Sequence, residues 1–256
     1  MAVLLAGGCR VSSMKEGTPA VSGSLKIWTQ VGRATGAKAI SLRILEFGPG
    51  TSPVIQNRES DEVLYCLEQI PGTPSLNEQC TMRLDGRAFE ITSQTGIYLR
   101  PGKSMTVENH GQESVVFVSA QCPEPEVEVS SQEATRSTTA VFPGVKLSDR
   151  AAIPTADRWY RVLVDNEVGS EQVTQFVGSI PPGRAPDHFH QYEEVLFILR
   201  GEGRMWAGET NTPIGPGSCI YLPKGQIHCV ENTGSDELRL LGVFYPAGSP
   251  SVRYEA

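Results

Sequence analysis

Two histidines stand one residue apart in the segment from Gly183 to Gly203, GRAPDHFHQYEEVLFILRGEG, although the whole chain has only four histidines. Alternate side chains of a β-strand face the same way, so His188 and His190 are expected to project into one interior. Glu194 begins the apolar run that follows, and a buried carboxylate needs a compensating charge. A metal ion would supply that charge.

A third histidine, His228, follows the glycine turn in the segment PKGQIHCVEN. Three imidazoles and one carboxylate suit borderline divalent metals, namely Mn, Fe, Co, Ni, Cu or Zn. The predicted metal ligands are His188, His190, Glu194 and His228. Glu193 faces away from Glu194 on an alternating strand and is expected to be a solvated carboxylate. His110, in the polar turn ENHG, is expected to lie outside the site.

The segments that must position these residues are short and rich in Val, Ile, Leu and aromatic residues. Runs such as EVLYCLE, RLDGRAFEI, EVLFILRG and LRLLGVFY are bounded by Gly, Pro, Asn and Asp, and helical periodicity is nearly absent. Many short strands separated by turn residues predict an all-β chain built of two antiparallel barrels or sandwiches.

The order of these segments repeats along the chain. Residues 44–68 parallel residues 176–200, and GIYLRPGKSMTVENHG at 96–111 parallels SCIYLPKGQIHCVENTG at 218–234. Two halves that share two blocks in one order indicate a duplicated domain. The stretch between them is rich in Pro, Ser, Thr and Glu. We therefore expect an N-terminal barrel with an N-terminal arm at 1–125, a linker at 126–157 and a C-terminal barrel at 158–256.

The two histidine-bearing blocks resemble the paired signatures of the cupin superfamily. GRAPDHFHQYEEVLFILRG is similar to the first signature, with four residues rather than five before its first histidine, and GSCIYLPKGQIHCVEN is similar to the second. The resemblance implies two jelly-roll barrels, a bicupin, in which the C-terminal barrel holds one metal. In that family the metal ligands are three histidines and a glutamate, matching His188, His190, Glu194 and His228.

The first half has lost most of this ligand set. Aligning the repeats puts Gln56, Arg58, Glu62 and Met105 at the ligand positions. A guanidinium cannot ligate a cation, so Arg58 is expected to pair with Glu62 inside the barrel. Met105 is expected to fill a gap in the core. We interpret this barrel as degenerate, without metal, and serving packing rather than anion binding.

A metal with open coordination positions can polarise a carbonyl, bind an enolate, or bind dioxygen beside a chelated substrate. Among the reactions known for similar cupins, we interpret the chain as a metal-dependent oxidoreductase of dioxygenase type acting on a small organic molecule. Two alternatives remain open at this point. One is an isomerase, lyase or decarboxylase, and the other is a non-catalytic protein that binds a small molecule.

Several side chains are candidates for contact with that molecule. Tyr192 could act as an acid or hydrogen-bond donor. Arg161 and Arg204 could hold an anionic substrate. The aliphatic side chains expected to line a mostly apolar cavity are Leu196, Ile198, Val230 and Val243.

Composition limits the other partners. A formal net charge of −7, without a concentrated basic patch, argues against nucleic acid and anionic membranes. The six cysteines are scattered without CxxC spacing, so free thiols in the cytoplasm are expected. The first ten residues, MAVLLAGGCR, lack a basic start and are expected to form a strand or arm rather than a signal peptide. We expect a monomer or homodimer, with the arm on its own second barrel.

Overall fold

The computed structural model describes residues 1–57, 59–68, 80–124 and 144–252. The all-β prediction is confirmed, because helical structure in this part of the chain is confined to short 3₁₀ segments. These segments are η1 (Ala6–Gly8), η2 (Arg33–Thr35), η3 (Leu147–Asp149) and η4 (Asn166–Val168). No helix among the described residues is long and apolar enough to cross a membrane.

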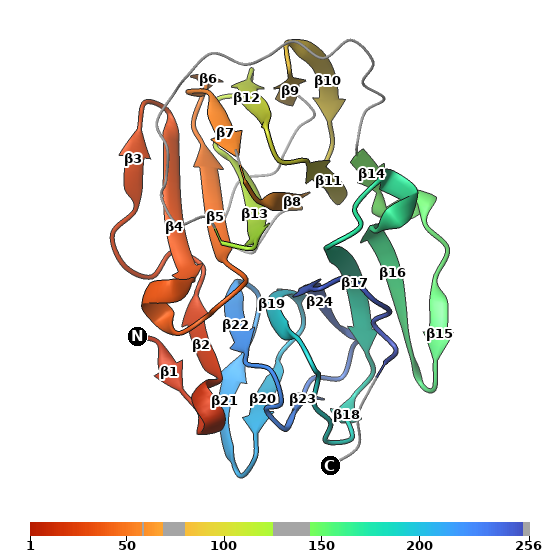
Figure 1. Cartoon of the computed structure of the whole chain (residues 1–256). Helices are drawn as coiled ribbons and strands as arrows, with labels where there is room; N and C mark the ends of the chain where they lie inside the picture. The colour runs from red at the N-terminus through yellow and green to blue at the C-terminus, as the bar shows by residue number, and fades with distance from the viewer. Residues whose placement is uncertain (58, 69–79, 125–143, 253–256) are drawn as a thin grey trace.

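Two antiparallel sheets form the N-terminal barrel (Figure 1). The strands of its larger sheet are, in spatial order, β14 (Gly144–Lys146), β11 (Thr95–Leu99), β8 (Asp61–Cys66), β13 (Val115–Cys122), β5 (Leu42–Phe47), β4 (Leu25–Val31) and β3 (Ala20–Ser22). Those of the smaller sheet are β10 (Arg87–Ile91), β9 (Cys80–Leu84), β12 (Lys103–Asn109) and β6 (Gly50–Thr51), with β7 (Ile55–Asn57) also paired to β12.

The C-terminal barrel repeats this plan. The strands of its larger sheet are β1 (Val3–Leu4), β2 (Arg10–Ser13), β22 (Ser218–Leu222), β19 (Glu193–Arg200), β24 (Leu238–Tyr245), β17 (Thr174–Ile180), β16 (Arg158–Val164) and β15 (Ile153–Thr155). Those of its smaller sheet are β18 (Gly183–Arg184), β23 (His228–Asn232), β20 (Gly203–Ala207) and β21 (Thr210–Ile214).

Strand β19 shows how one segment serves two cores. Its even-numbered side chains, including Leu196 and Ile198, belong to the core inside the C-terminal barrel. Its odd-numbered side chains Val195 and Phe197 belong to a second core that contains residues of both barrels. A strand buried on both faces reads as a continuous apolar run, which is what the sequence VLFIL shows.

A buried carboxylate, that of Glu193, lies between the two barrels. Glu193 is 8% exposed and accepts hydrogen bonds from the backbone amides of Lys38 and Ala39, at 2.7 to 3.1 Å. It also accepts a 2.6 Å bond from the hydroxyl of Tyr221. Glu193 does face away from Glu194, but the prediction of a solvated side chain is wrong, because that face of β19 meets the other barrel.

The two barrels exchange their leading strands. β2, from the N-terminal arm, pairs with β22 of the C-terminal barrel, where Arg10 lies opposite Tyr221. β14, just before the second half, pairs with β11 of the N-terminal barrel, where Thr95 lies opposite Lys146. Figure 1 shows both pairings, one on each side of the molecule. Each arm thus covers a sheet edge of the other half, which would otherwise expose unpaired backbone groups.

The exchange bears on the predicted domains. The arm, assigned with residues 1–125, adds β1 and β2 to the sheet of the other barrel. Of the predicted linker, residues 126–143 lie outside the described residues, whereas 144–157 contain β14, η3 and β15. The boundaries at 125 and 158 stay a prediction, and the arm lies on the second barrel of its own chain, as expected.

Two neighbouring leucines test whether the arm stabilises the barrel that it covers. Leu5 is 7% exposed and packs in the core of the C-terminal barrel, whereas Leu4 is 70% exposed. We expect Leu5→Ala to lower the free energy of unfolding by about 2–4 kcal/mol through loss of burial and the cavity left behind. Leu4→Ala should change it by less than about 0.5 kcal/mol. Urea unfolding followed by circular dichroism measures both, and equal effects would contradict the packing of the arm.

Candidate metal centre

Backbone pairing brings the three histidines together. His188 and His228 form an isolated antiparallel bridge, in which the amide of His188 donates to the carbonyl of His228 at 3.1 Å and the reverse bond is 2.8 Å long. The amide of Gly225 donates to the carbonyl of His190 at 2.8 Å. Gly225 has a φ of +78°, a conformation that favours glycine. The turn before β23 therefore sets the register that gathers the imidazoles.

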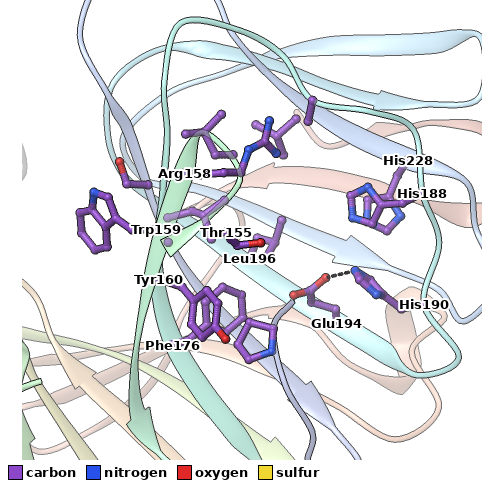
Figure 2. A pocket seen from close by; sticks show the side chains of 17 residues that line it. Thr155, Arg158, Trp159, Tyr160, Phe176, His188, His190, Glu194, Leu196 and His228 are labelled. Atoms are coloured by element: carbon purple, nitrogen blue, oxygen red, sulfur yellow. Dashed lines mark ion pairs between the residues drawn. The ribbon is translucent and has the colours of Figure 1, made fainter. Parts of the chain in front are cut away.

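The side chains converge on one point. One nitrogen from each of His188, His190 and His228 lies within 4.8 Å of the others. Oε2 of Glu194 lies 3.4 Å from Nε2 of His190, an ion pair drawn in Figure 2. The structure thus brings together all four residues that the sequence predicts as ligands.

Second contacts orient two of the rings. Nδ1 of His188 lies 3.1 Å from the carbonyl of Pro186, and Nδ1 of His228 lies 2.8 Å from the carbonyl of Gln226. Each Nδ1–H can donate to its carbonyl, which leaves the lone pair of Nε2 available as a ligand. Metal-binding histidines are typically held in this way by an outer hydrogen bond.

The charges of the site fit a cation. Burial raises the pKa of Glu194 to about 8. Burial, with a smaller contribution from His188, lowers the pKa of His228 to about 4. A protein interior that disfavours the carboxylate while keeping imidazole neutral is one in which a divalent cation compensates the negative charge and accepts the nitrogen lone pairs. The donor set therefore fits a borderline divalent metal.

The four residues line a cavity of about 110 Å³, which is large enough for several waters or a small molecule. Its wall is mostly apolar and includes Phe176, Leu196, Val230 and Leu240. Of the aliphatic side chains predicted to line it, Leu196 and Val230 do so. Ile198 packs in the core of the same barrel without lining the cavity.

The other predicted substrate contacts lie elsewhere. Val243 points into the core between the barrels, because odd-numbered residues of β24 face that way. Arg161 donates to the backbone carbonyl of Leu147 at 2.9 Å and does not line the cavity. Arg204 is exposed and donates to Asn211 at 2.6 Å. Strand phase decides each placement, and it is ambiguous in sequences with apolar residues on both faces.

Because strand phase is ambiguous, the sequence did not identify Arg158 as a lining residue, although it lines the cavity. Arg158 begins β16, and Tyr160, two residues on, faces the same interior. The run RWYRVLV offers two arginines three residues apart, on opposite faces of the strand. Each arginine has an aromatic residue in phase with it, Tyr160 for Arg158 and Trp159 for Arg161, so the sequence contains no signal that distinguishes them.

Tyr192 contacts one of the proposed metal ligands, His190. Its ring stacks on His190, with centroids 4.7 Å apart and planes at 9°. It also stacks on Phe244, with centroids 4.5 Å apart and planes at 19°. Tyr192 is not among the residues that line the cavity. These ring contacts suit a residue that holds the imidazole of His190 in place, and the role of an acid stays a prediction.

In the N-terminal barrel, the glutamate at the position equivalent to Glu194 has different partners. Glu62 is fully buried and accepts bonds from Arg43 and Ser119, each at 2.6 Å, and from Gln121 at 3.3 Å. Arg58, the predicted partner, lies outside the described residues, so its pairing with Glu62 stays a prediction. Among the described residues, Arg43 supplies the cation that contacts Glu62. The remaining two aligned positions are a half-buried Gln56 and Met105, which lies in the apolar core.

Strand register explains how the surroundings of the two glutamates differ. In the C-terminal barrel, the register positions that correspond to Arg43 and Ser119 hold Phe176 and Gly242, and Phe244 lies opposite Glu194 where Gln121 lies opposite Glu62. A Cβ on Gly242 would lie 2.3 Å from the ring of Phe176, so glycine is required for that ring to cross β24. An apolar wall thus replaces the arginine that compensates the carboxylate in the other barrel.

Comparison with known proteins agrees with this geometry. Residues 176–244 match the family model described as a cupin domain. This part of the second half is therefore similar to a cupin domain. The fold of the first half repeats that barrel, and within the described residues the cluster of three histidines lies in the second barrel.

Sequence relatives match about a quarter of the chain. Auxin-binding protein 1 of Arabidopsis thaliana is 32% identical over 83 residues, covering 28% of this chain and 42% of that protein. The oxalate-binding protein of Thermotoga maritima is 36% identical over 66 residues, covering 25% of this chain and 54% of that protein. The matches therefore span about half the length of these relatives.

Solved structures match the whole fold. The protein Ylba of E. coli has a TM-score of 0.73 at 13% identity, with 98% of this chain and 96% of that chain covered. A mutant of oxalate decarboxylase from Bacillus subtilis has a TM-score of 0.69 at 13% identity, covering 92% of this chain and 76% of that chain. At this identity the likeness establishes the fold alone.

The buried pair of the N-terminal barrel yields a prediction about stability. Arg43→Met leaves Glu62 buried without its cation and should lower the free energy of unfolding by about 3–5 kcal/mol. The double variant Arg43→Met/Glu62→Leu should recover most of that loss, because it removes both charges. Urea unfolding measures both variants. A single variant as stable as the parent would show that Ser119 and Gln121 suffice for the carboxylate.

Two substitutions distinguish the contribution of the Tyr192 ring to metal binding from that of its hydroxyl group. Tyr192→Phe keeps the ring against His190 and should leave metal affinity unchanged. Tyr192→Ala removes the ring and should weaken metal binding by about tenfold, as is typical for groups that orient a ligand. Titration of the apoprotein with Mn²⁺ measures the affinity. If Tyr192→Phe binds metal as weakly as Tyr192→Ala, the hydroxyl rather than the ring matters.

Proposed function

We propose that the C-terminal barrel binds one divalent transition metal through His188, His190, Glu194 and His228, and that the metal acts on a small organic molecule in the adjoining cavity. The observation that carries the proposal is the convergence of three imidazole nitrogens within 4.8 Å, with a buried carboxylate beside them. Four donors leave room in the coordination sphere of Mn, Fe, Co, Ni or Cu for a ligand from the cavity.

The bound metal would supply Lewis acidity and, for a redox-active ion, one-electron chemistry. The residues of the chain have simpler tasks. His188 and His228 keep their Nε2 atoms directed at the ion through their outer hydrogen bonds. Phe176, Leu196 and Leu240 shape the cavity and exclude water from the substrate.

We favour a dioxygenase type of reaction over an isomerase or lyase. Those reactions need a group that moves a proton at neutral pH. Apart from the proposed ligands, the titratable groups among the described lining residues are Arg158 and Tyr160. Neither is a base near pH 7 in its ordinary state. A reaction between dioxygen and a metal-chelated substrate has less need of such a group.

A decarboxylase or a non-catalytic binding protein is the second candidate. The support for it is that similar proteins are named for binding auxin or oxalate, and one structural neighbour is an oxalate decarboxylase. A mostly apolar cavity with a cation at one end would also suit storage or sensing of a small acid.

Metal analysis tests the site. The purified protein should contain close to one equivalent of transition metal, and His190→Ala or His228→Ala should remove most of it. Both variants should keep the circular dichroism spectrum of the parent, because apolar strands supply most of the burial. His110→Ala is the control, since His110 lies in the other barrel beside Thr81. Full metal occupancy in His228→Ala would refute the assignment.

Oxygen uptake separates the two candidate functions. Protein reconstituted with Fe²⁺ should consume dioxygen in the presence of some member of a panel of small diketones, thiols and carboxylic acids. His228→Ala should not. Release of carbon dioxide without dioxygen uptake would favour a decarboxylase, and saturable binding without turnover would favour a binding protein.

A further inference from the structure

A second cationic group faces the cavity. Arg158, at the start of β16, is part of the cavity lining, and its side chain is only 13% exposed. Its Nε donates to Oδ1 of Asp157 at 3.0 Å. Asp157 is 66% exposed, so solvent screens this pair and the pair contributes little to stability. Among the described residues the guanidinium has no further hydrogen bond, and its two terminal amino groups remain as donors.

The position of Arg158 sets it apart from the metal ligands. Figure 2 shows Arg158 on one side of the cavity and His188, His190 and His228 on the other. Apolar side chains make up most of the wall, including Phe176 and Leu196. With the proposed metal at the histidines, the cavity would have a cationic group at each end and apolar walls between them, which suits a ligand that is polar at both ends. A planar guanidinium binds carboxylate through two parallel hydrogen bonds.

We propose that Arg158 is the specificity-determining residue for a small organic acid. The carboxylate of that acid binds the guanidinium of Arg158, its short carbon skeleton lies against Phe176 and Leu196, and its other end carries an oxygen donor directed at the metal. The inference rests on the proposed metal site. It names the substrate class, namely a compact acid with a second oxygen function such as a dicarboxylate, hydroxy acid or keto acid.

A series of acids of increasing length tests the two-ended arrangement. The probes are acetate, malonate, succinate and glutarate, titrated by calorimetry into protein reconstituted with Mn²⁺. Acetate can occupy only one end, so it should bind weakly. A dicarboxylate of matching length should bind more tightly. Arg158→Gln should weaken that dicarboxylate by about tenfold or more, the usual effect of losing a charge-assisted hydrogen bond, and should leave acetate binding at the metal unchanged.

Controls distinguish the possible failures. Arg204→Gln removes an arginine from the surface of the same barrel and should bind every acid as the parent does. Arg158→Lys should restore part of the affinity lost in Arg158→Gln. Metal content is measured for each variant and should equal that of the parent.

Three results would overturn the inference. The first is a dicarboxylate that binds Arg158→Gln as tightly as the parent, and the second is equal weakening of acetate and the dicarboxylate. The third is metal-loaded parent protein that binds none of the acids. If instead the parent protein takes up no metal, the proposed function fails first, and the inference fails with it.

Discussion

A carboxylate buried at the head of an inner strand constrains both halves of this molecule. Glu62 and Glu194 occupy equivalent positions and are both buried, so each charge needs compensation from its surroundings. In one barrel the compensation comes from Arg43, Ser119 and Gln121, which fill the interior. In the other, Phe176 and Gly242 replace two of the polar groups, and the carboxylate lies at the cavity beside the histidines, 3.4 Å from Nε2 of His190. The ion that we propose would compensate its charge there.

The same strand ties this chemistry to the packing of the two barrels. Glu194 points into the cavity and Glu193 points at the loop that carries Lys38 and Ala39. A shift of β19 by one residue would exchange the two carboxylates and bury each among the wrong partners. Packing between the barrels and geometry at the candidate metal centre are therefore set by one register.

The fold and the ligand set could be predicted from the sequence because both depend on local patterns. Alternation within HFH and the spacing to Glu194 place three side chains on one face, and the internal repeat gives the second barrel. The cavity wall could not be predicted in the same way, because strands buried on both faces do not reveal their phase. The sequence predicts Arg161 and Val243 as lining residues, whereas the structure has Arg158 and Phe176 there. Arg43 was missed because its partner Glu62 lies on another strand, and the exchanged arms depend on pairings between distant segments.

The exchanged arms have a consequence for the order in which the chain is made. β2 lies near the start of the chain, yet its partner β22 lies in the last quarter, with Arg10 opposite Tyr221. During synthesis the arm leaves the ribosome long before that partner exists, so Leu5 and Val11, both buried in the finished barrel, stay without their final contacts until almost the entire polypeptide has emerged. The N-terminal barrel can gain β14 much earlier. The nascent chain can therefore complete its N-terminal half first, whereas the half that carries the histidine cluster is complete only when β1 and β2 pair with it.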